Sequence, residues 1–400
     1  MKSFGSTFAL VFFAACMSSA LPGPAAPVPT EPASLASTLP NEPTAWDQQA
    51  AAKYLDDRMD LWFEKARKLG TGEGKTSCVS CHMTVPYALA RPVLRKAAGV
   101  SQPTPQEAKL LDETLRRVDT YGNHEALSKG KEEQSRGTEA VLNALILAGE
   151  DARQNRHAPS GPTRRALEEL WTAQRADGAW NWLDTGMEPY ECSDSVYYGA
   201  ALAAMAVGTA PGYYARGADE KVSSGVGKLR SYLKANYADQ NLYSRAWLLL
   251  ASTRLEGLLS REQTDALTTD LQREQNADGG WSLYKLGPWT WSKAKPPYAP
   301  KGKPDVSLLS KSDAYATGLI AYAIRQAGLP ADHPSLKRAT VWLEANQKEC
   351  QIDQSRWKCW RAYSLNFDTE QGGEDGEPWR RMFMSDGATA FAALALLPSD

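Results

Sequence analysis

The sequence predicts an all-α protein in which about six helical hairpins form two concentric rings. Two observations carry this prediction: a short motif recurs at the same place in successive hairpins, and amphipathic helical segments alternate with almost wholly apolar ones. An apolar helix must be covered on all sides, whereas an amphipathic helix needs cover on one face only. We therefore expect apolar helices inside and amphipathic helices outside, with no strand pattern anywhere.

In each hairpin the amphipathic segment comes first and the apolar segment follows it. We expect outer helices at residues 50–66, 107–118, 164–174, 225–236, 261–275 and 336–347. We expect inner helices at residues 84–97, 137–149, 193–208, 242–255, 312–328 and 385–397. Pro86 is compatible with this assignment because it lies in the first turn of its helix.

The recurring motif is Q-x-x-D-G-x-W, which follows an outer helix in both of its copies. The copies consist of Gln174, Asp177, Gly178 and Trp180, and of Gln275, Asp278, Gly279 and Trp281. Asp and Gly favour a tight turn after a helix, and we expect the Trp to pack on the next repeat. The motif therefore predicts a structural role and no chemistry.

Three inner segments open with a Ser-Asp pair, whose acidic members are Asp194, Asp313 and Asp386. Ser or Asp at a helix start accepts hydrogen bonds from free backbone amides. Helix capping therefore explains all three pairs. The alternative is that these three residues are acids at the mouth of a cavity.

The hairpins and both motif copies resemble the squalene–hopene cyclase and protein prenyltransferase superfamily over roughly residues 45–398. The two copies match the "QW" repeat of the cyclases residue for residue. The resemblance implies an α/α toroid around an apolar, aromatic-lined cavity that takes an isoprenoid.

Three departures count against the family's activities. Class II cyclases protonate an alkene with the central Asp of a D-x-D-D motif, but the matching region here reads Asp194-Ser195-Val196-Tyr197, and no D-x-D-D occurs in the chain. The chain also supplies one toroid where squalene cyclases use two. The zinc ligands of the prenyltransferases have no recognisable counterpart beyond Asp194 or Cys192.

Residues 78–82 read Cys-Val-Ser-Cys-His, and C-x-x-C-H is the spacing that attaches a c-type haem. Cys78 and Cys81 can each add to one haem vinyl group, which leaves His82 to ligate the iron. The motif lies in the first outer-to-inner loop, at the same end as the Ser-Asp pairs. The sequence thus predicts one covalent haem c at the cavity mouth, shielded by one or more of Trp182, Trp289, Trp291 and Trp379.

The iron's second ligand is left open among residues at that end. The candidates are His124, Met187, Met382 and Met384, whereas His157 and His333 lie in inner-to-outer connections at the other end. Methionine would favour electron transfer, and an open position would permit binding of small molecules.

The cysteines also allow other chemistry. Cys78 and Cys81 could form a redox disulfide, or join His82 in a zinc site completed by Cys192 or His124. Cys350 and Cys359 could form a disulfide that closes a loop around Trp357 in an oxidising compartment. Cys192 would then be single and buried.

The amino terminus predicts export. Residues 1–20 read as a signal peptide, with an apolar run at 8–15. Residues 13–16 are an alternative lipobox that would place a lipid on Cys16. Residues 21–43 are a Pro- and Ala-rich linker, and residues 44–400 form the toroid. The protein would be periplasmic or a membrane-tethered lipoprotein.

These features favour an exported toroid with one covalent haem, serving electron transfer with a redox partner protein or redox chemistry on an apolar, isoprenoid-like ligand. The alternatives are a terpenoid cyclase-like enzyme and a non-catalytic binding module. The balance of 45 basic and 47 acidic residues gives no indication of a nucleic-acid partner.

Overall fold

The structure of this chain is a computed structural model that describes residues 46–69, 75–122, 128–214, 219–289, 306–352, 354–366, 380 and 382–398. The chain divides into two units, Met1–Glu42 and Pro43–Asp400, and every described residue belongs to the second. The predicted signal peptide, Cys16 and the linker lie outside the described residues.

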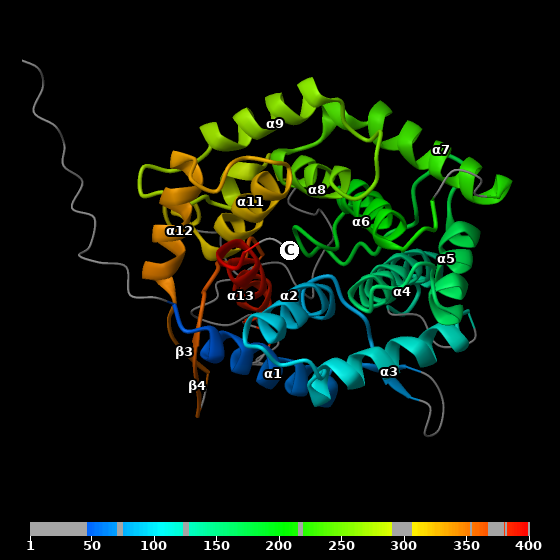
Figure 1. Cartoon of the computed structure of the whole chain (residues 1–400), viewed down its shortest axis with the longest axis horizontal. Coiled ribbons are helices and arrows are strands. Elements are labelled where there is room, and N and C mark those ends of the chain that lie inside the picture. The colour runs from blue at the N-terminus through cyan, green and yellow to red at the C-terminus, as the bar shows by residue number, and fades with distance from the viewer. Residues whose placement is uncertain are drawn as a thin grey trace, which may run out of the picture. The chain divides into compact units, whose positions relative to one another are not determined.

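The all-α prediction is confirmed. The inner helices are α2 (Thr84–Ala97), α4 (Glu132–Arg153), α6 (Ser195–Thr209), α8 (Leu242–Ser252), α11 (Ala314–Gln326) and α13 (Phe383–Leu396). Each packs on the next, and α13 packs on α2, so the last inner helix meets the first (Figure 1).

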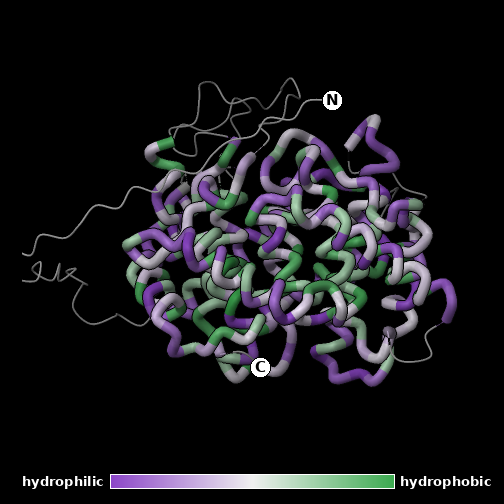
Figure 2. The backbone as a smooth tube through the Cα atoms, turned by 90° about the horizontal axis from the view of Figure 1, so that it is seen from above, coloured by the Kyte–Doolittle hydropathy of each residue, from purple (hydrophilic) through white to green (hydrophobic). Residues whose placement is uncertain are grey.

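The amphipathic helices lie outside these six in Figure 1. They are α1 (Gln48–Lys65), α3 (Pro105–Asp119), α5 (Gly161–Ala173), α7 (Glu220–Ala235), α9 (Arg261–Arg273) and α12 (Pro334–Asn346). Shorter helical segments are α10 (Val306–Leu309), η2 (Tyr237–Asp239) and η3 (Tyr284–Leu286). Figure 2 shows that apolar stretches run through the middle of the body and hydrophilic stretches along its periphery.

The inner helices are rich in small residues because their neighbours approach them closely. A Cβ atom on Gly199 of α6 would lie 2.3 Å from the Trp182 ring, and one on Gly318 of α11 would lie 2.5 Å from the Ala392 amide of α13. Contacts this short leave no room for a methyl group.

The expectation of no strands is wrong in detail. Two antiparallel pairs occur: β1 (Lys68–Leu69) with β2 (Thr76–Ser77), and β3 (Lys348–Ile352) with β4 (Ser355–Cys359). Both pairs lie in outer-to-inner connections. The first is too short for an alternating pattern to reveal it.

The two Q-x-x-D-G-x-W copies form the same hydrogen-bonded turn. In both copies the Trp indole nitrogen donates to a carbonyl in the last turns of the preceding helix. Trp180 donates to the Leu170 carbonyl at 2.8 Å, and Trp281 donates to the Leu271 carbonyl at 2.7 Å. The glycines have φ values of 98° and 96°, a conformation that glycine adopts without strain. These contacts support the structural role expected for the motif.

The motif glutamines link neighbouring outer helices. Gln174 donates to the Gly225 carbonyl of α7 at 3.0 Å, and Gln275 donates to the Ser335 carbonyl of α12 at 2.9 Å.

A third copy of this arrangement is present in expanded form. Gln347 donates to the Asp47 carbonyl at 2.9 Å, and Trp360 donates to the Leu343 carbonyl at 2.8 Å. The β3–β4 hairpin stands where the tight turn stands in the other copies. The residue that Gln347 reaches is the N-cap of α1, so the same link that joins neighbouring repeats also joins the last to the first.

Candidate functional site

The CVSCH segment connects β2 to α2, and its central residue, Ser80, forms hydrogen bonds with residues at the start of the helix. The Ser80 hydroxyl accepts from the amides of Met83 at 3.1 Å and Thr84 at 3.3 Å. The Thr84 hydroxyl donates back to the Ser80 carbonyl at 2.9 Å. These bonds cap the start of α2 and hold the centre of the motif in one conformation.

Side chains from α1 and α3 hold the approach to the motif. The Trp62 indole donates to the Cys78 carbonyl at 2.9 Å, and Glu113 accepts from the Ser77 amide at 2.8 Å. Arg117 donates to the Ser77 carbonyl at 3.3 Å and pairs with Glu139 of α4 at 2.6 Å. The loop that carries both cysteines is therefore anchored to α1 and α3, and the Arg117–Glu139 pair ties α3 to α4.

His82 is 5% exposed and lies in an aromatic surrounding. The Phe383 ring stacks on it with centroids 4.2 Å apart, Trp62 meets it edge-on at 5.3 Å, and Tyr190 lies at 6.1 Å. Its Nδ1 atom is buried and has no hydrogen-bond partner. Burial, with smaller contributions from Arg58 and Arg380, lowers the pKa of His82 to about 3. The imidazole is therefore neutral at pH 7, the form that ligates metals.

The two motif cysteines are free thiols, in contrast to Cys350 and Cys359, which form a disulfide with a Cα–Cα distance of 5.9 Å. Cys78 is half-buried, whereas Cys81 is 1% exposed. Burial raises the pKa of Cys78 to about 11 and that of Cys81 well above its usual value. Both are therefore protonated at neutral pH, unlike the thiolates of reactive cysteines.

The predicted zinc arrangement has no support in the described part of the chain. No set of three His, Cys, Asp or Glu side chains there is placed to hold a metal ion. Of the two possible fourth ligands, Cys192 lies 3.1 Å from the Ser195 hydroxyl, and His124 lies outside the described residues.

The donor set fits haem c, because two free thiols precede a neutral imidazole with an unpartnered ring nitrogen. The space beside it is small. Cys78 lines a cavity with Trp62, Glu113 and Arg117 that has room for about one water molecule. A porphyrin is far larger, so binding it would displace side chains that now cover the motif.

The candidates for a second iron ligand differ in burial, and Met382 and Met384 are the chain neighbours of Phe383, which stacks on His82. His124 lies outside the described residues, Met187 is half-buried, and Met382 and Met384 are buried. His157 is exposed, and His333 accepts from the Ser335 amide at the start of α12.

Two of the four tryptophans expected to shield the haem, Trp182 and Trp289, belong to the described chain, and Trp182 donates to the carbonyl of Tyr190 at 2.9 Å. Trp182 packs on Tyr198 and Trp289 on Tyr243, whereas Trp291 and Trp379 fall in segments that the structure does not describe. The rings of Trp62, Tyr190 and Phe383 contact His82 directly, and no local sequence pattern predicted these three residues.

Only one of the three Ser-Asp pairs caps a helix through its acid. Asp313 accepts from the amides of Ala316 at 2.9 Å and Leu283 at 2.6 Å. Asp194 is exposed and makes no capping bond. Asp386 lies inside α13, because that helix begins at Phe383 rather than at Ser385. The capping prediction is wrong for Asp194 and Asp386.

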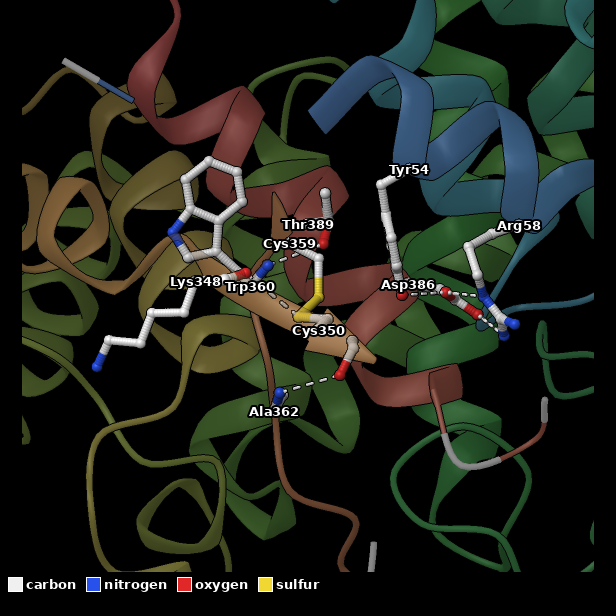
Figure 3. The surroundings of a disulfide bond; sticks show 10 residues. Tyr54, Arg58, Lys348, Cys350, Cys359, Trp360, Ala362, Asp386 and Thr389 are labelled. Carbon is white, nitrogen blue, oxygen red and sulfur yellow. Dashed lines mark hydrogen bonds and ion pairs between the residues drawn. A yellow bond between two sulfur atoms is a disulfide. The ribbon is translucent and has the colours of Figure 1, made fainter. Parts of the chain in front are cut away.

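Asp386 instead forms a buried ion pair with Arg58 of α1 (Figure 3). The guanidinium binds both carboxylate oxygens, Nε at 2.7 Å and Nη2 at 2.8 Å, and the Tyr54 hydroxyl donates to the same carboxylate at 2.7 Å. Both charged side chains are 1% exposed.

Aromatic side chains extend from His82 into the ring of inner helices. Tyr190 lies edge-on to Tyr315 at 5.8 Å, and the hydroxyls of Tyr315 and Tyr243 are 3.1 Å apart. The Tyr198 hydroxyl and the Trp247 indole nitrogen are buried without a hydrogen-bond partner. This interior therefore combines apolar surface with unused hydrogen-bond donors.

None of the described helices is both long and apolar enough to cross a membrane. Comparison with protein-family models and with curated proteins finds no match to this chain.

Proposed function

We propose that this protein is an exported, squalene-cyclase-like toroid that carries one covalent c-type haem on Cys78 and Cys81, with His82 as an axial ligand. It would transfer electrons to or from a redox partner protein, or perform redox chemistry on an apolar ligand. Bound haem would supply a one-electron couple whose potential the axial ligands and the surrounding polarity set.

The observation that carries the proposal is the state of His82. A buried, neutral imidazole with an unpartnered nitrogen is costly unless that nitrogen binds something. The same segment supplies two free thiols at haem-attachment spacing. The side chains of Trp62, Tyr190 and Phe383 would exclude water from the ligand.

Export has separate support. The Cys350–Cys359 disulfide is of a kind that persists in oxidising compartments such as the periplasm. Haem c is attached outside the cytoplasm, so a signal peptide at residues 1–20 and a haem motif are mutually consistent.

The haem proposal is tested by a haem stain of the denatured protein on a gel, after expression in a periplasm with haem-attachment machinery. We expect the wild type to stain and the Cys78→Ala/Cys81→Ala variant not to stain. Cys192→Ala is the matched control, because it removes the other buried free thiol and should leave staining unchanged. An unstained wild type, in cells where a control cytochrome stains, would refute the proposal, and so would equal staining of the double variant.

A binding role for an apolar ligand is the second candidate, supported by the unpartnered donors of Tyr198 and Trp247. A ligand with an oxygen acceptor would satisfy them. Binding of a short polyprenyl alcohol, followed by tryptophan fluorescence, should weaken in Tyr198→Phe, because that variant lacks the hydroxyl that would donate to the alcohol oxygen. A cyclase-like activity is less favoured, because Asp313 and Asp386 already accept hydrogen bonds from protein groups.

A further inference from the structure

His82 lies at the seam where the first helix of the ring meets the last. Trp62 belongs to α1 and Phe383 to α13, and both rings contact the imidazole. The two rings also contact each other, with centroids 6.1 Å apart. His82 is therefore covered by a contact that exists only after the last helix has packed on the first.

One helical turn away, an ion pair fastens the same two helices. Arg58 precedes Trp62 by four residues and Asp386 follows Phe383 by three, so each lies on the same helix face as the aromatic residue beside it. Figure 3 shows Tyr54, Arg58 and Asp386 converging between the two helices. Breaking this pair would remove the opposite charge that a buried side chain now faces across the seam.

The disulfide hairpin β3–β4 binds both helices. Trp357 donates to Asp57 of α1 at 2.8 Å. After the hairpin, the Trp360 amide donates to Thr389 of α13 at 3.2 Å and the Ala362 amide donates to Ser385 at 3.3 Å (Figure 3). The Cys350–Cys359 bond therefore holds together a segment that bridges the seam.

We propose that α13 and the β3–β4 hairpin form a latch that seals His82 inside the ring, so that metal ligation by His82 must be completed before α13 packs on α1. His82 is 5% exposed in the closed form. The latch does not depend on haem; only its application to haem attachment rests on the proposed function.

Carbethoxylation of histidines by diethyl pyrocarbonate tests the latch without haem. The full chain is exported in cells that lack haem-attachment machinery, so that the disulfide forms, and modification at pH 7 is followed by peptide mass spectrometry. His82 is buried and His157 is exposed, so the ratio of their modification rates reports access to His82. Exposed His157 is the internal positive control. We expect His157 to react readily and His82 to be at least about tenfold slower, because reaction requires local opening.

Two changes at the seam should open the latch. Asp386→Asn and the Cys350→Ser/Cys359→Ser variant should each raise the His82 rate at least about tenfold, because each weakens the seam selectively. Asp219→Ala is the matched control, since it removes the N-cap of α7, away from the seam. It should change the His82 rate by less than about twofold. Circular dichroism checks that each variant folds.

If a seam variant fails to fold, Tyr54→Phe provides the test. It removes one hydrogen bond to Asp386 and keeps the ion pair, so it should raise the His82 rate by a smaller factor. A wild-type His82 that reacts as fast as His157, or an equal response to Asp219→Ala and Asp386→Asn, would overturn the latch. Haem that attaches to the folded, disulfide-bonded protein would overturn it too, whereas failure of the gel stain alone would count only against the haem proposal.

Discussion

Replacing Asp386 by asparagine tests the energy stored in the contact between α1 and α13. The change keeps the shape of the side chain but leaves the Arg58 guanidinium, 1% exposed, without its counter-charge. Removing one partner of a buried ion pair costs about 3–5 kcal/mol. Tyr54 also loses a charged acceptor, but the Asn carbonyl can still accept its hydrogen bond. We therefore expect the free energy of unfolding to fall by about 3–5 kcal/mol.

Urea unfolding of the haem-free protein, followed by circular dichroism, measures this loss. The Arg58→Met/Asp386→Leu double variant separates charge from packing, because replacing both members of a buried pair by apolar residues is often neutral or stabilising. It should recover most of the loss. A fall below about 1 kcal/mol for Asp386→Asn, the range of exposed ion pairs, would refute the reasoning. A double variant as unstable as the single one would refute it equally.

Three further predictions concern other parts of the ring. Gly199→Ala should lower the free energy of unfolding by about 1–3 kcal/mol, because its Cβ would overlap Trp182. Gly227→Ala, at a helical site with no atom within 4 Å of the added Cβ, should instead raise the free energy of unfolding by about 0.5–1 kcal/mol. Urea unfolding compares the two variants. Trp281→Phe should cost about 1 kcal/mol from the lost indole hydrogen bond alone, and an unchanged urea midpoint would contradict the turn's role. Burial raises the pKa of Glu188 to about 8, so the folded state holds a proton that the unfolded state loses above about pH 4.3. Stability from this group is therefore present at low pH and lost as pH rises to about 8, and Glu188→Gln should flatten that part of the stability–pH curve.

The helices were predictable because their signals are local. The segment at residues 84–97 coincides with α2, and the other eleven predicted segments overlap observed helices. Both Q-x-x-D-G-x-W turns follow from residues close in sequence. The third link was missed because a twelve-residue hairpin separates Gln347 from Trp360, which removes the spacing that defines the motif.

The surroundings of His82 could not be predicted in the same way. Trp62 and Phe383 come together only through the packing of α13 on α1, and no pattern within either segment encodes that contact. Asp386 was misassigned for a related reason. The Ser-Asp pair has the local appearance of a cap, yet the helix begins earlier and turns the carboxylate toward Arg58.

The hydrogen bond between Gln347 and Asp47 makes the junction between the last and first hairpins resemble the junctions within the ring. In the described chain, the junction between the last and first hairpins uses the same glutamine-to-backbone contact as the internal junctions at Gln174 and Gln275. The position of a hairpin in the ring therefore does not depend on whether that hairpin comes first or last in the chain. A circular permutant whose new ends lie in an exposed inner-to-outer connection, such as that around His157, should keep the same neighbours throughout. It would differ mainly in which hairpin leaves the ribosome last and completes the ring.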